Sequence, residues 1–325
     1  MDEGWSVQNA FTSEPIRGDD FGQFIQQLEF ETLPDDIVNQ AKRLILEAVS
    51  WFYIGKRRPQ SENLEGFIKS VATKPEASIA GYADKVDMVW AAFANSYYAQ
   101  AEGGNDGQRE ASVYGGSYHP GRCVIPVALA AAEKYGVSGK ALITAIVAGY
   151  EAAYRFRGLD PRPPSEAYAA SVTAAKIMGL NSFQIIDSLS IAGINTSALI
   201  NSEEYNPVNF LTTAHVSKIG IEAALMAKAG LPAPPLQDDS RFSPRFEVHD
   251  LGKVFGISQL YIKPYLGCRL LQGAVDAALD FRAKVTSDFK SIDEIRVRTV
   301  TEAAYTIHHV TPDSYYIDCQ LSLPY

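Results

Sequence analysis

Cysteine is scarce in this chain of 325 residues, which contains only Cys123, Cys268 and Cys319, all far apart in the sequence. The three form no CxxC pair and are too few for a disulfide framework, so we expect reduced thiols in an intracellular compartment and no cysteine-bound metal. Cys123 precedes an apolar segment, which predicts a buried and unreactive thiol.

The chain also lacks an apolar run near the roughly 18 residues that a bilayer span requires. Asp2 and Glu3 lie where a secretory signal would have basic residues, so we expect a cytoplasmic protein without a membrane partner. The formal net charge of −9 argues against a surface that follows nucleic-acid phosphates. An anionic substrate must therefore meet a local group of basic side chains.

The composition, 46% hydrophobic and 21% charged, is typical of a globular protein with a sizeable core. Apolar residues recur at three- and four-residue spacing in many segments. Ser138 and either Asn181 or Ser182 are candidate N-caps, and helices are expected to end at Gly55, Gly179 and Gly230. This pattern predicts a mainly α protein with helices over 33–55, 86–101, 125–134, 139–157, a segment ending at 179, 181–200, 215–228 and 270–284.

Prolines 232, 234, 235 and 244 lie among polar residues in segment 231–245, which favours a linker there. We therefore expect a large all-helical domain over 1–245 and a smaller α+β domain over 246–325. Within the second domain, β-branched and charged residues alternate partially over 292–300, which predicts an exposed strand.

Four segments of the chain carry specific motifs: LPDD at 33–36, HPGR at 119–122, VAGYEAAY at 147–154 and KPY at 263–265 with Cys268 and Arg269. Taken in order, they resemble the MmgE/PrpD family, which contains 2-methylcitrate dehydratase and cis-aconitate decarboxylase. The resemblance implies an active site in a cleft between a large helical and a smaller α+β domain, a homodimer, and cofactor-independent chemistry on small organic acids. The closing CQLSLPY resembles a family strand that is normally followed by more chain, so we expect an incomplete second domain.

The resemblance places the family's active-site histidine at His119 and its active-site lysine at Lys263. In place of the family's HxxD(F/Y)DDT, the chain has QAEGGNDG at 100–107, where Asp106 retains an acid. Asp160 stands where the family has another histidine. His119, Lys263, Asp106 and Asp160 are therefore the candidate catalytic residues.

Candidate substrate-binding residues are Glu102 and Tyr114 in a glycine-rich loop, together with Arg122, Asn209, Arg269 and Gln272. Gln100, Asn209, Thr212 and Gln272 replace cationic family residues, which disfavours a polycarboxylate and favours a less charged substrate, because each lost charge-assisted contact is worth about 1.5–3 kcal/mol. A metal site at His308 and His309 is not expected.

Several of these residues also have a purely structural interpretation. His119 is either an acid or base, or a loop histidine bonded to backbone, and Lys263 is either catalytic or a surface lysine beside a proline. Asp160 is either an acid in the cleft or a helix cap. The glycine-rich loop either covers the substrate or is solvated.

Three functions remain open. The first is a lyase, either a dehydratase or a decarboxylase, that abstracts a proton next to a carboxylate or carbonyl. The second is an isomerase, epimerase or cyclase acting on a less charged metabolite. The third is a non-catalytic member that needs a partner chain to complete its second domain.

Overall fold

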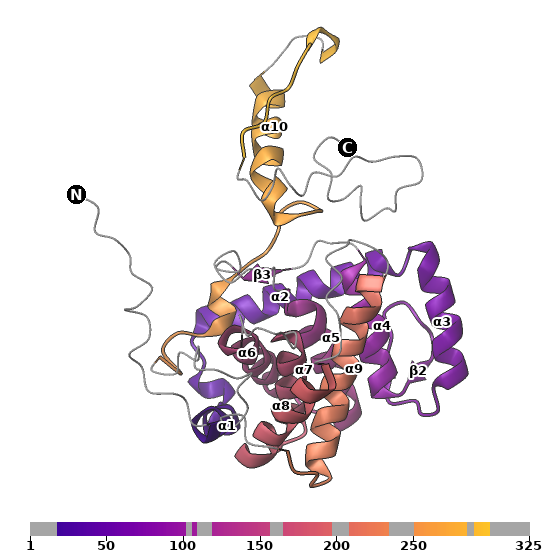
Figure 1. Ribbon diagram of the computed structural model, residues 1–325, viewed down its shortest axis with the longest axis vertical. Helices are drawn as coiled ribbons and strands as arrows, with labels where there is room; N and C mark the ends of the chain where they lie inside the picture. Colours follow the sequence, from indigo (N-terminus) through magenta and orange to yellow (C-terminus); the bar gives the residue numbers. More distant parts are fainter. Residues whose placement is uncertain are drawn as a thin grey trace, which may run out of the picture.

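The computed structural model describes residues 18–101, 106–108, 119–156, 165–196, 208–233, 250–284 and 289–299, and most of these are helical. The prediction of a mainly α protein is confirmed. The helices, coloured along the chain in Figure 1, are α1 (Gly18–Gln27), α2 (Asp35–Gly55), α3 (Pro59–Val71), α4 (Met88–Gln100), α5 (Gly121–Tyr135), α6 (Gly139–Arg155), α7 (Ser165–Ile177), α8 (Ser182–Thr196), α9 (Val208–Lys228) and α10 (Gln272–Lys284). None of these helices combines the length and apolar character needed to cross a membrane.

Strands are few and short in the described part of the chain. β1 (Ala77–Ser78) pairs antiparallel with β2 (Lys85–Val86), and β3 (Gly107–Gln108) pairs antiparallel with β4 (Leu260–Tyr261). The second pair joins segments that are about 150 residues apart in the sequence, and it brings Asp106 and Lys263 to the same region.

Helix ends follow the predicted capping chemistry. The Ser138 hydroxyl accepts from the Ala141 amide at 3.2 Å, and Asn181 Oδ1 accepts from the Gln184 amide at 3.0 Å. Gly179 and Gly230 have φ of 68° and 86°, a conformation that favours glycine, and each terminates the helix before it.

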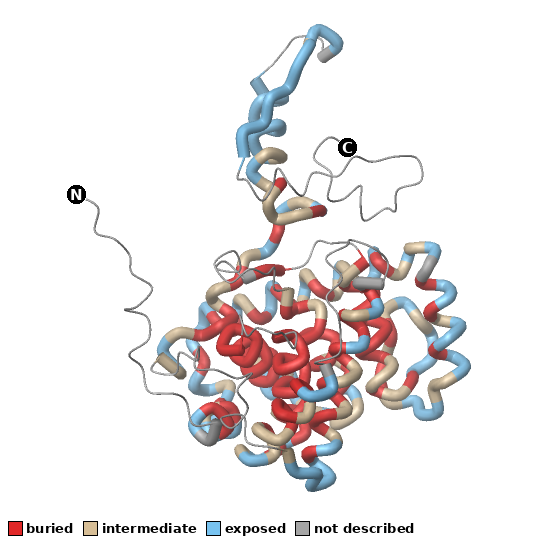
Figure 2. Tube along the Cα trace, viewed as in Figure 1, coloured by how far each residue is buried: buried red, intermediate tan, exposed pale blue. Residues whose placement is uncertain are grey.

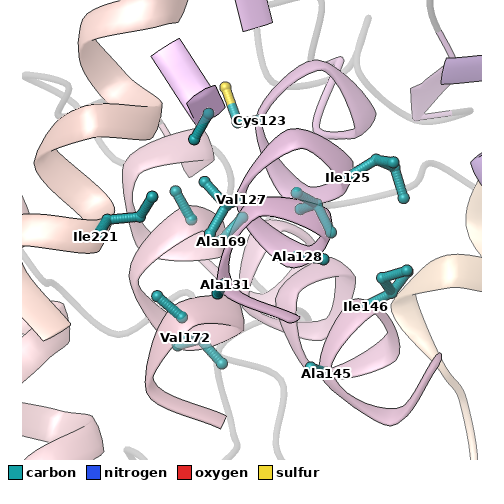
Figure 3. Close-up of a cluster of buried hydrophobic side chains, with 14 of the residues drawn as sticks. Cys123, Ile125, Val127, Ala128, Ala131, Ala145, Ile146, Ala169, Val172 and Ile221 are labelled. Carbon is teal, nitrogen blue, oxygen red and sulfur yellow. The ribbon is translucent and has the colours of Figure 1, made fainter. Parts of the chain in front are cut away.

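The core lies where α5, α6, α7 and α9 meet, and small side chains allow these helices to approach closely. Figure 3 shows Cys123, Val127 and Ala131 of α5 beside Ala169 of α7 and Ile221 of α9. Cys123 is fully buried, so the prediction of a buried thiol is confirmed, and burial raises the pKa of this thiol to about 12.

Two helices were not predicted. α1 is short, but Phe21 and Ile25 are buried, and Lys176 of α7 donates to the carbonyls of Ile25 and Gln26 at 2.7 and 2.9 Å. These bonds satisfy carbonyls at the end of α1 that have no partner within the helix. α3 begins with Pro59 at its first turn, a position where proline is tolerated.

The predicted strand over 292–300 is wrong in its described part, because residues 292–299 form neither helix nor strand. A strand requires a neighbour to bond its backbone groups, and no described segment pairs with this one. The side chains of Ile295 and Val297 are exposed.

The chain after residue 250 first packs against the helical body and then leaves it. Phe255, Ile257 and Leu260 belong to the same hydrophobic core as the helices. In contrast, α10 has no buried residue and projects from the body (Figures 1 and 2). The division at residue 245 remains a prediction, but residues 255–260 are part of the helical core.

A buried ionic network fixes this returning segment to α6. Arg155 Nε donates to Glu151 Oε1 at 2.8 Å, and the guanidinium also bonds Asp250 and the Val254 carbonyl. Glu151 Oε2 accepts from the Gly256 amide at 2.6 Å. Both side chains of the Arg155–Glu151 pair are fully buried, so removing one partner leaves an uncompensated charge.

We predict that Arg155→Ala lowers the free energy of unfolding by about 3–5 kcal/mol, because Glu151 would then be buried without its cation. Urea denaturation measures this change. The control is Lys140→Ala, which removes an exposed pair with Glu31 and should leave the urea midpoint almost unchanged. Equal midpoints for the two variants would contradict the prediction.

Candidate active site

The carboxylate of Asp106 joins three elements of the fold. It lies beyond the end of α4 and is 1% exposed. Asp106 Oδ1 accepts from the Gly121 amide at the start of α5 at 3.1 Å, and Oδ2 accepts from the Tyr150 hydroxyl of α6 at 2.9 Å. Burial raises the pKa of Asp106 to about 6, while these two hydrogen bonds oppose the rise.

The imidazole ring of His119 is held by the backbone of Asp106. Its Nδ1 bonds the carbonyl oxygen of Asp106, and since a carbonyl can only accept, Nδ1 carries the proton. The neutral ring therefore has Nε2 as its basic nitrogen. Burial, followed by the charges of Lys263 and Arg122, lowers the pKa of His119 well below its usual value. The backbone-bonded and the catalytic interpretations are thus compatible, because the backbone bond selects the tautomer of a base.

Lys263 is 7% exposed, so its interpretation as a surface lysine is wrong. Its ammonium group donates to the Gly267 carbonyl at 3.2 Å. Burial lowers its pKa to about 8; the charge of Arg122 adds to this effect and that of Asp106 opposes it. Lys263 therefore keeps its positive charge near neutral pH and loses it at mildly alkaline pH.

Arg122 lies beside His119 and is bound by the protein itself. One terminal nitrogen donates to Gln100 Oε1 at 2.6 Å, and the other donates to Glu166 Oε1 of α7 at 3.2 Å. The same Glu166 oxygen lies 3.4 Å from the amide nitrogen of His119. A protein carboxylate therefore neutralises part of the charge that would otherwise attract an anionic ligand.

Glu47 of α2 is a third acidic group near this site. Its Oε1 accepts from Trp51 Nε1 at 3.3 Å. Burial and then the charge of Asp106 raise the pKa of Glu47 to about 8, and Lys263 opposes this rise. Glu47 is therefore largely protonated at neutral pH.

Sequence reasoning missed Glu47, Glu166 and Tyr150. Glu47 and Glu166 are isolated acids within apolar or alanine-rich helical stretches, and this is the signal that could have identified them. Tyr150 lies within the VAGYEAAY motif and resembles an ordinary core tyrosine in the sequence.

The structure says less about the remaining residues that were predicted for the site. Arg269 is close enough for its charge to lower the pKa of His119. The side-chain amide of Gln272 bonds backbone groups of Tyr265 and Cys268, so its place in substrate binding stays a prediction. Glu102, Tyr114 and Asp160 lie outside the described residues, as does the side chain of Asn209.

The fold and this site define a mainly α protein in which a neutral histidine and a buried lysine lie close to a buried carboxylate. The model of the MmgE/PrpD N-terminal domain matches residues 19–237, and the chain belongs to this family.

Three curated relatives share low identity with the chain. Cis-aconitate decarboxylase of Aspergillus terreus is 25% identical over 283 residues, which cover 77% of this chain and 57% of that protein. A cis-aconitate decarboxylase-like protein, oryM, of Aspergillus oryzae is 24% identical over 64% of this chain and 46% of its own length. Cis-aconitate decarboxylase of Mus musculus is 24% identical over 65% and 45%. The chain spans about half the length of the curated relatives it matches.

We predict that Tyr150→Phe destabilises the protein more above pH 6 than below pH 4, since the lost hydrogen bond favours ionised Asp106. Because folding raises the pKa of Asp106, the protonated carboxyl group stabilises the folded state. This stabilisation is complete below pH 3.8, the pKa in the unfolded chain, and is lost as the pH rises through about 6. Without the Tyr150 hydroxyl this pKa is higher, so the loss at alkaline pH is larger, by about 1.5–3 kcal/mol.

The measurement is the free energy of unfolding of both proteins from pH 3.5 to 8. Tyr53→Phe, which alters an exposed tyrosine, is the control. A difference between Tyr150→Phe and the unmodified protein that does not vary with pH would refute the coupling.

Proposed function

We propose that the protein is a cofactor-independent lyase, a dehydratase or decarboxylase, that acts on a small organic acid by proton transfer next to a carboxylate or carbonyl. The observation that carries this proposal is His119, a partly buried neutral imidazole whose protonated nitrogen is fixed by the Asp106 carbonyl, beside the buried cation Lys263. The curated relatives named as decarboxylases support carboxy-lyase chemistry.

The proposed roles follow from the charges of the two groups. In a dehydration, His119 Nε2 removes a proton from carbon, the electron pair forms the double bond, and the hydroxyl group leaves as water after it is protonated. In a decarboxylation, the C–C bond to the carboxylate breaks and carbon dioxide leaves, while the electron pair remains as an enolate, which takes up a proton from the solvent. In both reactions the Lys263 ammonium stabilises the negative charge that develops on the oxygen next to the reacting carbon.

Proton NMR in deuterated buffer tests the reaction class. The purified protein is incubated with cis-aconitate, 2-methylcitrate and a set of less charged hydroxy and keto acids. Loss of water or carbon dioxide from one of them is the expected result. No reaction with any of them would count against the proposal.

We predict that His119→Ala lowers kcat about 10²–10⁴-fold and that Lys263→Ala lowers it about 10²–10³-fold, since each variant removes a group that acts in the transition state. The wild-type rate should fall as the pH rises through about 8, because Lys263 then loses its charge. Lys263→Arg retains a charge that does not titrate in this range, so its remaining activity should lack this alkaline decline.

Lys140→Ala, at the exposed pair with Glu31, is the control for these rate measurements. Circular dichroism checks that every variant is folded. Unchanged rates in folded His119→Ala and Lys263→Ala would remove both residues from the mechanism.

A second candidate is an isomerase, epimerase or cyclase that acts on a less charged metabolite. The ion pair between Arg122 and Glu166 favours it, because a protein carboxylate already binds one terminal nitrogen of this guanidinium. A substrate carboxylate at Arg122 would have to displace Glu166 or lie beside its negative charge. Deuterium incorporation without loss of water or carbon dioxide would identify this reaction.

We predict that Glu166→Gln binds cis-aconitate more tightly than the unmodified protein, because the variant removes one negative charge and releases part of the Arg122 guanidinium. A charge-assisted hydrogen bond gained in this way is worth about 1.5–3 kcal/mol, roughly a 10- to 150-fold lower Kd. Isothermal titration calorimetry gives the two Kd values. The matched control is Glu65→Gln, which alters the glutamate paired with Lys56 in a different part of the fold. Equal or weaker binding by Glu166→Gln would show that Glu166 does not select against anionic substrates.

A further inference from the structure

The hydroxyl group of Tyr261 is buried without a hydrogen-bond partner in the part of the chain that the structure describes. Buried hydroxyl groups almost always have a partner, because removing them from water otherwise costs free energy. An unsatisfied hydroxyl next to candidate catalytic residues therefore calls for a ligand as its partner.

The fold places this hydroxyl beside the proposed reacting groups. Tyr261 is the second residue of β4, opposite Gly107 of β3, which directly follows Asp106. Tyr261 also precedes Lys263 by two residues. The residue between them, Ile262, is exposed, whereas Lys263 is buried. Both Tyr261 and Lys263 lie close enough to Asp106 for its charge to shift their pKa values.

Gly107 makes this position possible. A Cβ atom added at Gly107 would collide with the phenol oxygen and the ring of Tyr261. A residue larger than glycine would therefore displace the Tyr261 hydroxyl from its place next to Asp106.

The surroundings keep the phenol protonated. Burial raises the pKa of Tyr261 to about 12; the charge of Arg269 opposes this rise, and that of Asp106 adds to it. At neutral pH the group is therefore a hydrogen-bond donor, and it lies within reach of the charges of a carboxylate and a guanidinium.

We propose that Tyr261 is a further catalytic residue, whose hydroxyl donates a hydrogen bond to the carboxylate or carbonyl oxygen of the substrate that gains negative charge during the reaction. This inference rests on the proposed function for the identity of the ligand, a small organic acid. Tyr261 and Lys263 would then stabilise the same oxygen from one extended segment, while His119 transfers the proton. Tyr261 itself forms and breaks no covalent bond.

The test is Tyr261→Phe, which removes only the unpaired oxygen. If the hydroxyl serves the substrate, kcat falls about 10²–10³-fold, as when one donor to a developing oxyanion is removed. The melting temperature without ligand should stay equal or rise, because the variant removes a buried group that makes no bond in the folded protein. A purely structural role predicts the opposite, a lower melting temperature with unchanged kcat.

Tyr265→Phe is the matched control, four residues further along the chain. Its hydroxyl donates to Asp276 of α10 at 2.8 Å and so already has a protein partner. Its kcat should stay within about twofold of the unmodified protein, because the loss of a partnered surface hydroxyl has little effect on the reacting groups. A kcat of Tyr261→Phe within twofold of wild type, or a clearly lower melting temperature, would overturn the proposal.

A binding measurement separates this proposal from the proposed reaction. The shift in melting temperature caused by cis-aconitate and by each less charged acid is recorded for both proteins. If the unmodified protein shows no turnover but a shift that Tyr261→Phe loses, the lyase proposal fails, whereas the hydrogen bond from the Tyr261 hydroxyl to the ligand stands. Equal shifts, or no shift in the unmodified protein with any of these acids, would overturn the role of Tyr261.

Discussion

The site depends on the hydrogen bonds that the carboxylate of Asp106 accepts. Its bonds to the Gly121 amide and the Tyr150 hydroxyl join the segment after α4 to α5 and α6. Because the side chain is fixed at both oxygens, the peptide carbonyl of the same residue is fixed as well, and this carbonyl sets the tautomer of His119. The family acid at this position therefore acts on His119 through backbone geometry, and its own carboxylate need not contact a substrate.

Burial shifts the pKa values of Asp106 itself and of three groups near it. It keeps His119 neutral, brings the pKa of Lys263 to about 8, and raises the pKa values of Asp106 and Glu47 to about 6 and about 8. Together with Glu166, three carboxyl groups lie near Lys263 and Arg122. This near balance of charge differs from a site built to hold several substrate carboxylates, which needs an excess of cations. The balance therefore supports our second proposal, a reaction on a less charged metabolite.

The sequence allowed the helices to be predicted well and the site only in part. Apolar spacing and capping residues such as Ser138 and Asn181 are local signals, so they located most helices. The resemblance added His119, Lys263 and Asp106, which the structure brings together. Glu166 was missed because its role depends on Arg122, 44 residues away, and the predicted strand over 292–300 failed because local β-propensity cannot supply a partner strand.

The position of Lys263 is set by the helical body, although it lies in the region assigned to a second domain. Its segment is anchored before it by the Arg155 network and by the burial of Ile257 and Leu260, and β4 pairs with β3 beside Asp106. The exposed helix α10 begins only after these anchors. The distance between Lys263 and His119 is therefore determined by contacts within the core, so that a movement of α10 against the body would leave the two proposed reacting groups in place.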